Sequence, residues 1–163
     1  MKKVITILIL FFSFEFNLHA DSNRIVSGKQ SAKISIIVYE SLTCSHCADF
    51  HKNVYPNLKK DYIDTGLAKI EFRHFPLDAA AFNASKIVQC KKDQGLEILE
   101  VLYSNQQKWI KGNTIEQVND NLKKLIDSVG FKSELEKSIS DKKMEDYILK
   151  HRIEGAQNFK VNA

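Results

Sequence analysis

The sequence predicts an α/β fold in which a small parallel sheet is followed by a long helical region. Residues 33–40 (KISIIVYE) are rich in β-branched side chains, as is typical of a buried strand. Residues 69–75 (KIEFRHF) alternate apolar and polar side chains, which indicates a second strand. Helical patterns separate these runs and then fill the chain from Ala79 to about Asn158. This order predicts a right-handed βαβ unit with parallel strands.

The helix between the two predicted strands runs from Cys44 to about Tyr62. Its spacing places four side chains near one apolar face: Cys47, Phe50, Val54 and Leu58. Ser41 or Thr43 is expected to cap its start with a hydroxyl group. Pro56 lies inside the helix and predicts a kink, because proline removes a backbone hydrogen bond.

Loops and helix ends follow from polar residues and glycines. Residues 21–32 are polar and predict a loop before the first strand, and residues 64–66 (Asp-Thr-Gly) predict a turn after the first helix. Gly95 marks a break in the helical region. Residues 114–117 have the spacing of a capping box, and Gly130 is expected to end the helix that begins there. The apolar stripes of these helices are expected to face the core.

The first twenty residues predict a secretory signal peptide. Lys2 and Lys3 give a positive start, and an almost unbroken apolar run follows from Val4 to Phe14. Ala20 is a small residue before a plausible cleavage point. The run is shorter than the ~20 residues that span a bilayer. An uncleaved membrane anchor is the alternative interpretation.

Composition limits the classes of function. The chain has 163 residues, enough for one domain, and 44% hydrophobic residues, enough for a core. Its formal net charge of +4 comes from lysines interspersed with acidic residues. No basic block is present, so we do not expect a nucleic-acid partner.

Three cysteines, Cys44, Cys47 and Cys90, are too few for a disulfide framework. A close pair with one cysteine left over indicates redox chemistry instead. Cys90 lies in an apolar helical stretch, and we expect it to act as a small buried hydrophobic residue.

The Cys44-Ser45-His46-Cys47 motif follows a predicted strand and opens a predicted helix. A helix start presents unpaired N–H groups and a partial positive charge, which stabilise a thiolate. Cys44 is nearer the tip and is expected to be the nucleophile. Cys47 lies one turn inside and is expected to be the resolving thiol. Their spacing places both sulfurs on one face, within reach of a disulfide.

His46 lies between the two cysteines and is the third predicted site residue. When protonated, it adds positive charge beside Cys44 and favours the thiolate. A stabilised thiolate stabilises the reduced form, so the disulfide becomes a stronger oxidant. The alternative for His46 is an exposed polar residue with little effect.

Metal binding is the competing use of a C-x-x-C motif. A structural zinc site needs four ligands, and the chain has no second cysteine pair. His51 and His74 could complete a set with the two cysteines, but that spacing matches no standard pattern. We therefore predict no bound metal.

The motif and its surroundings resemble the bacterial DsbA-like thiol:disulfide oxidoreductases of the thioredoxin-fold family. The resemblance begins at residues 40–47 (ESLTCSHC), which an apolar strand precedes. It continues through short segments elsewhere in the chain: 55–56, 62–66, 73–78, Cys90 with 94–95, and 156–161. It thus extends over residues 33–163.

This resemblance implies a thioredoxin-like βαβ core, with residues 21–163 as one domain and a helical insertion at about 79–150. It implies donation of disulfide bonds to exported proteins in the periplasm through a redox-active pair, Cys44 and Cys47. Cysteine-containing exported proteins would be the substrates, and a membrane redox partner would reoxidise the pair. No dissociable cofactor is implied. A reductase or isomerase on the same fold is the alternative activity.

One departure from the family concerns the C-terminal end. Family members continue into a cis-proline loop, a β-hairpin and a final helix, whereas this sequence stops at residues 161–163. We therefore expect an incomplete domain that lacks the hairpin and final helix. The strand at 33–40 should then lie at a sheet edge, in a sheet of about two strands. A truncated, inactive remnant is a further alternative.

Overall fold

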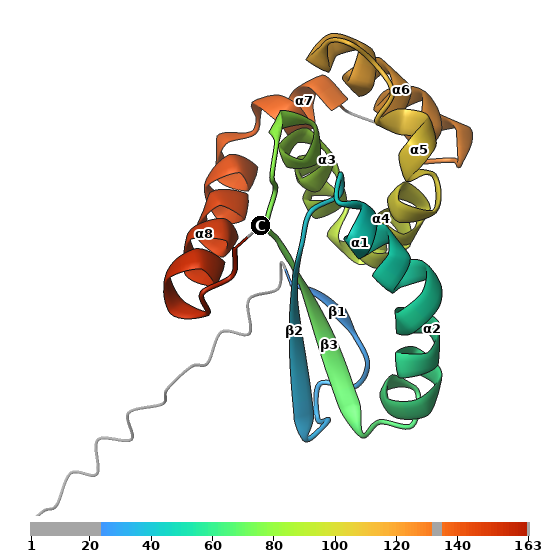
Figure 1. Cartoon of the computed structure of the whole chain (residues 1–163), viewed down its shortest axis with the longest axis vertical. Helices are drawn as coiled ribbons and strands as arrows, with labels where there is room; N and C mark the ends of the chain where they lie inside the picture. The colour runs from blue at the N-terminus through green and yellow to red at the C-terminus, as the bar shows by residue number, and fades with distance from the viewer. Residues whose placement is uncertain (1–23, 132–134, 163) are drawn as a thin grey trace, which may run out of the picture.

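A computed structural model describes residues 24–131 and 135–162, which form a three-stranded sheet flanked by helices (Figure 1). The strands are β1 (Ile25–Ser27), β2 (Ile34–Glu40) and β3 (Ala68–His74), in the order β1-β3-β2. β2 and β3 are parallel, as predicted. The predicted signal peptide lies outside the described residues.

Strand β1 corrects the sequence analysis, which predicted a loop there and a sheet of about two strands. β1 pairs antiparallel with β3, and Ile25 lies opposite Phe72. Ile25 is buried in the core. A strand of three residues within a polar segment is too short for a detectable alternation, so its tertiary partner decides its structure.

Strand β2 lies at an edge of the sheet, as predicted, because β3 is its one partner among the described residues. It is not the buried strand that its composition suggested. Ile36 and Val38 pack toward the core, whereas Ile34 and Ile37 are exposed. Tyr39, on the same face as Ile37, is covered by helix α8 (Lys142–Asn158).

The helix between β2 and β3 is interrupted by two wide, π-helical turns. It consists of α1 (Ser45–Asp49), η1 (Phe50–Val54), α2 (Tyr55–Leu58) and η2 (Lys59–Ile63). A π-helical turn closes with a hydrogen bond from residue i+5 to residue i. Tyr55 N–H accordingly donates to Phe50 O, and Asp64 N–H donates to Lys59 O at 2.8 Å.

These wide turns make one of the predicted core positions wrong. The apolar face predicted from ordinary helical spacing included Val54, which is 49% exposed. Its neighbour Tyr55 is buried instead. The second wide turn has the same effect, since Ile63 is buried and Tyr62 is exposed. Each π turn moves the inward-facing position one residue further along the chain.

Pro56 lies in the first turn of α2. A first-turn position needs no backbone N–H, so proline is accommodated there. The sequence predicted a kink at Pro56. The irregularity of the helix is instead the π-helical turn η1, which directly precedes α2.

The rest of the chain is helical, as predicted, and the break at Gly95 is confirmed. The elements are α3 (Ala79–Cys90), η3 (Lys92–Gln94), α4 (Gly95–Ser104), α5 (Gln106–Trp109), α6 (Ile115–Ser128), α7 (Leu135–Ser140) and α8. Among the described residues, none of these helices has both the length and the apolar character needed to cross a bilayer.

The capping box predicted at residues 114–117 forms in a modified way. Thr114 Oγ1 accepts a hydrogen bond from Gln117 N–H at 3.4 Å, as a capping residue does. Gln117 Oε1 accepts from the N–H of Asn113 rather than from that of Thr114. Gly130, with φ of +88°, ends the segment.

The sheet separates two sets of contacts. One face of the sheet packs in the core against α1, α2 and α4, through Ile36, Val38, Ile70 and Phe72. Helix α8 lies on the other side of the sheet (Figure 1). Gly155 of α8 approaches the Tyr39 ring so closely that a Cβ atom there would lie 2.9 Å from it. This close approach explains why a glycine occurs in the middle of α8.

Glu71 and Arg73 of β3, which alternate with apolar residues in the sequence, are buried beneath α8. Arg73 Nε donates to Glu71 Oε1 at 2.6 Å, and Arg73 Nη1 donates to Glu154 Oε1 at 2.9 Å. A second carboxylate oxygen of Glu71 accepts from Arg24. This face of β3 is thus polar, and its charged side chains can be buried beneath α8 because they are paired with one another.

Candidate active site at the Cys44–Cys47 pair

The cysteine pair lies at the carboxyl end of β2, where the chain turns into α1. Cys44 N–H donates to Ser41 O at 3.0 Å and closes a tight turn. Cys44 is then the N-cap residue of α1, and its own carbonyl accepts from Ala48 N–H at 3.1 Å. Cys47 lies within the first turn. This confirms the predicted placement of the motif at a helix start.

Ser41 and Thr43 do not cap this helix as predicted. Thr43 Oγ1 donates to Asp78 Oδ2 at 2.7 Å, and Ser41 Oγ accepts from Leu77 N–H at 3.3 Å. Both hydroxyl groups therefore connect the turn before Cys44 to the loop after β3. Asp78 in turn caps α3 through Ala81 N–H. The loops at the carboxyl ends of the two parallel strands are held together.

The two thiols differ in their environment. Both are free and partly buried, and Cys47 also packs against the hydrophobic core. Burial raises the pKa of Cys47 to about 12, and interactions with Cys44 and the charge of Glu40 add to this increase. Cys47 is therefore a neutral thiol at neutral pH.

Glu40 and His51 form a buried pair beside the cysteines. His51 Nε2 lies 2.8 Å from Glu40 Oε2, and the side chains are 4% and 2% exposed, respectively. The His51 ring stacks on Tyr103 with centroids 4.3 Å apart. Burial raises the pKa of Glu40, although His51 opposes the increase. An ionisable carboxyl group thus lies close enough to influence Cys47 through its charge.

His46, the third predicted site residue, is exposed on the first turn of α1. Its position beside Cys44 agrees with the expected placement. Its effect on the ionisation of Cys44 stays a prediction.

The histidines considered for a zinc site have other partners. His51 Nε2 is bonded to Glu40, and His74 Nε2 lies 3.3 Å from Gln89 Oε1. Within residues 24–131 and 135–162, no three His, Cys, Asp or Glu side chains are grouped as metal ligands. Cys90 is partly buried at the end of α3, and its role stays open.

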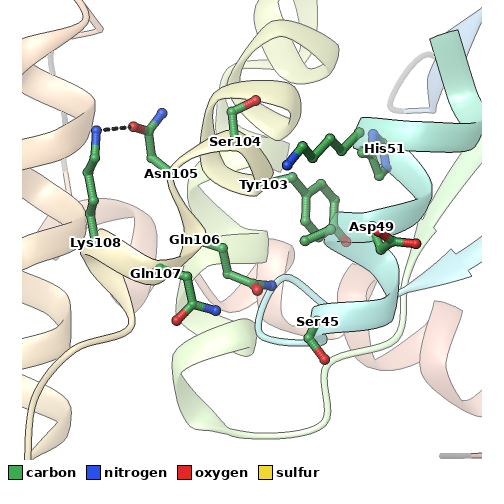
Figure 2. A pocket seen from close by; sticks show the side chains of 11 residues that line it. Ser45, Asp49, His51, Tyr103, Ser104, Asn105, Gln106, Gln107 and Lys108 are labelled. Carbon is green, nitrogen blue, oxygen red and sulfur yellow. Dashed lines mark hydrogen bonds between the residues drawn. The ribbon is translucent and has the colours of Figure 1, made fainter.

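A groove of about 480 Å³ opens between α1 and the segment that joins α4 to α5 (Figure 2). Ser45 and His51 line one wall, and residues 103–108 line the other. Gln106 extends from this second wall toward the turn before α1. Its Nε2 donates to Leu42 O at 2.9 Å and to Cys44 O at 3.0 Å.

Two residues of this site escaped the sequence analysis. Glu40 is a carboxylate at the end of an otherwise apolar strand, four residues before Cys44. That position in the sequence could have indicated that Glu40 lies near the cysteine pair. Gln106 gives no such signal, because it lies 62 residues from Cys44 in an ordinary polar stretch. Only the packing of α5 against the turn brings it to the site.

Comparison with known proteins places this arrangement in a family. The family model described as Thioredoxin matches residues 20–163, and the chain therefore belongs to the thioredoxin family. Its fold is DsbA-like. The crystal structure of Wolbachia pipientis alpha-DsbA1 matches with a TM-score of 0.76 and 30% identity, over 86% of this chain and 71% of that chain. The resemblance inferred from the sequence is confirmed.

Two further proteins are similar to this chain. The "Putative protein-disulfide oxidoreductase" of Rickettsia bellii is 28% identical over 144 residues, which is 84% of this chain and 53% of the relative. The structure of oxidised BdbD from Bacillus subtilis shares the fold, with a TM-score of 0.69 at 20% identity, over 87% of this chain and 78% of that one. The chain spans about half the length of the Rickettsia bellii relative. The predicted lack of a C-terminal hairpin and final helix stays a prediction.

Proposed function

We propose that this protein is a protein-disulfide oxidoreductase that promotes disulfide bond formation in exported proteins by exchange at Cys44 and Cys47. The inequality of the two thiols is the observation that carries this proposal. Cys47 is held neutral by burial, with its pKa raised to about 12, while Cys44 occupies the N-cap of α1. Because Cys47 keeps its proton, Cys44 is the sulfur placed to act as the nucleophile.

The oxidised protein would carry a Cys44–Cys47 disulfide. A substrate thiolate attacks Cys44 Sγ, the bond between Cys44 and Cys47 breaks, and Cys47 leaves with the electron pair. A mixed disulfide now joins the substrate to Cys44. A second substrate thiolate then attacks the substrate sulfur of this bond and releases the Cys44 thiolate. The substrate loses two electrons and gains a disulfide, and the protein becomes the dithiol.

Glu40 supplies the proton that the departing Cys47 sulfur takes up. Its carboxyl group has a pKa raised by burial and lies near enough to affect Cys47 electrostatically. The hydrogen bond with His51 fixes the orientation of the carboxyl group. In the reverse direction, the same carboxylate accepts the proton when Cys47 attacks a mixed disulfide.

The partners and location follow from the same proposal. The substrates are exported proteins with cysteines, and a membrane redox protein reoxidises the pair. Residues 1–20 direct the chain to the periplasm as a signal peptide or hold it at the membrane as an uncleaved anchor. His46 tunes Cys44 from its exposed position beside the nucleophile. The names of the similar proteins, which include "Disulfide bond formation protein D" of Bacillus subtilis, support this class of activity.

Trapping of mixed disulfides tests the two cysteine roles. Cys47→Ser should accumulate mixed disulfides through Cys44, because the resolving thiol is absent, while Cys44→Ser should accumulate almost none. Non-reducing gels with an oxidised model substrate measure this difference, since the Cys44 thiolate attacks the substrate disulfide, forms the mixed disulfide and releases the other substrate sulfur as a thiolate. Cys90→Ser is the control and should exchange like the natural chain. Equal trapping by the Cys44 and Cys47 variants would contradict the assigned roles.

The equilibrium with glutathione tests the direction of exchange. A disulfide donor should be reduced readily by glutathione, whereas a strongly reducing pair would support the reductase alternative. Loss of exchange together with a non-cooperative thermal melt would support the inactive remnant.

A further inference from the structure

Gln106 makes an unusual connection between the helical region and the cysteine turn. Its side chain is in α5, on the far side of the groove from α1, and the residue is only 3% exposed. Both hydrogen bonds of its amide nitrogen go to carbonyl groups of one short turn, those of Leu42 and Cys44. In Figure 2 the side chain points to this turn rather than along the groove.

The helix that carries Gln106 is itself firmly anchored. Trp109 in α5 is completely buried, and its ring N–H donates to Leu102 O at 3.0 Å. The amide of Gln106 is therefore presented from a fixed support. The two carbonyl groups that it binds lie on either side of Thr43, which Asp78 holds by its hydroxyl group. The turn is thus fixed from α5 and from the start of α3.

The bond to the Cys44 carbonyl has a direct consequence for the thiol. This carbonyl also accepts Ala48 N–H, the hydrogen bond that closes the first turn of α1. The backbone angles of Cys44 decide where its sulfur lies relative to Cys47 and to the N–H groups at the helix start. A buried donor that holds this carbonyl therefore controls the position of the nucleophilic sulfur.

We propose that Gln106 is a positioning residue for thiol exchange, in which its buried amide fixes the backbone of Cys44 at the N-cap of α1. This inference deepens the proposed function, on which it rests, by extending the active site to α5. Without the amide, the Cys44 carbonyl is free to tilt, and the sulfur loses its fixed relation to the helix start. Cys44 should then ionise less readily and form a weaker oxidant with Cys47.

The test replaces Gln106 by methionine, which keeps the length of the side chain but donates no hydrogen bond. The pH dependence of Cys44 alkylation by iodoacetamide is measured in full-length chains that carry Cys47→Ala and Cys90→Ala. We expect Gln106→Met to move the alkylation midpoint to higher pH and to slow the reaction about fivefold at pH values below the midpoint of the natural chain, as loss of one or two hydrogen bonds allows. In a chain that keeps both Cys44 and Cys47, the equilibrium constant for reduction of their disulfide by glutathione should fall by a similar factor.

Gln107→Met is the matched control, because Gln107 is the adjacent amide, lines the same groove and is exposed. It should leave both measurements unchanged. Gln106→His retains one donor and should give an alkylation midpoint and a glutathione equilibrium constant between those of Gln106→Met and the natural chain. If Gln106→Met gives no cooperative melt, Gln106→His is used in its place. Values within twofold of the natural chain in a folded Gln106 variant would overturn the proposal. A shifted alkylation profile without any glutathione exchange by the natural chain would instead overturn the proposed function and leave the positioning role standing.

Discussion

At the residue scale, Glu40 is a carboxyl group kept in the interior next to a reactive pair. One of its oxygens is bonded to His51, and the other lies buried without a hydrogen bond in the described part of the chain. Burial of an incompletely solvated carboxylate costs free energy, and the fold accepts this cost at the site. The burial of the Glu40 carboxyl group is therefore better explained by proton exchange with Cys47 than by a contribution to the stability of the fold.

Replacement of Glu40 by glutamine should make stability less dependent on pH. Because the pKa of Glu40 is raised in the fold, the folded chain binds its proton more tightly than the unfolded chain does. The natural chain therefore loses stability as pH rises from about 4.5 through the raised pKa. At pH 8 we expect Glu40→Gln to be more stable than the natural chain by about 1 kcal/mol, as measured by urea unfolding.

The exposed Glu97 provides the control for this measurement. Glu97→Gln should keep the pH dependence of the natural chain. An equal change in both variants would show that the effect is one of general charge rather than of the buried carboxyl group.

The placement of the cysteine pair at a helix start, with His46 between the two cysteines, could be predicted from a local motif. Glu40 and Gln106 could not be assigned roles, because these depend on contacts across the fold. The same holds for Ser41 and Thr43, whose hydroxyl groups bind the loop after β3 rather than the helix that follows them. Short polar side chains have several local partners, and sequence spacing does not choose between them.

At the element scale, the contact between β3 and α8 contains two histidines. His74 is buried at the end of β3, and its ring lies 6.3 Å from that of His151 in α8. Burial lowers the pKa of His74 to about 3, the charge of His151 adds to this decrease, and the hydrogen bond that the His74 ring donates to Gln89 Oε1 opposes it. His74 is thus neutral in the folded protein under most conditions.

Acid should weaken this contact through His74. The unfolded chain binds a proton at His74 near pH 6.5, whereas the folded chain does so only near pH 3. The stability that His74 contributes is therefore complete above pH 6.5 and is lost as pH falls toward 3, at up to about 1.4 kcal/mol per pH unit. Urea unfolding of His74→Gln between pH 7 and pH 4 should show a shallower loss than that of the natural chain.

The comparison between these two chains cancels the contribution of Glu40, whose sign is opposite because its pKa is raised. Parallel stability curves for the natural chain and His74→Gln would contradict this assignment. Near-ultraviolet circular dichroism of the aromatic contacts around α8 would show whether that helix separates first.

At the scale of the whole molecule, the sheet has an open edge along β2. Among the described residues, β2 lies at one edge of the order β1-β3-β2, with the three-residue β1 at the other. The exposed Ile34 and Ile37 of β2 are uncharged and β-branched. An edge strand with these properties presents free backbone groups for pairing with another chain. The free chain should therefore associate increasingly as its concentration rises.

Ile37→Lys should reduce this association, because a lysine on an edge strand opposes pairing with a second strand. The side chain of Ile37 is on the face away from the core, so we expect the fold to be kept. Sedimentation at increasing protein concentration measures the effect. Ile153→Lys, on the exposed surface of α8, is the control and should associate like the natural chain.

Much of this molecular plan follows from periodicity alone, namely the parallel βαβ unit and the helical stretch after Ala79. Strand β1 does not follow from it, since three residues acquire their structure from pairing with β3. Neither does the burial of Glu71 and Arg73, because the alternation of polar residues cannot show that α8 covers them with a counter-charge.

The wide turns at Phe50–Val54 and Lys59–Ile63 also affect how the chain should be aligned with its relatives. A π-helical turn accommodates one extra residue while the helical segments on both sides keep their facing. A relative with one residue fewer at either turn could therefore present the same side chains to its core through an unbroken helix. Gaps opposite these two segments should accordingly be interpreted as local changes of pitch, and not as evidence that the relatives differ in architecture.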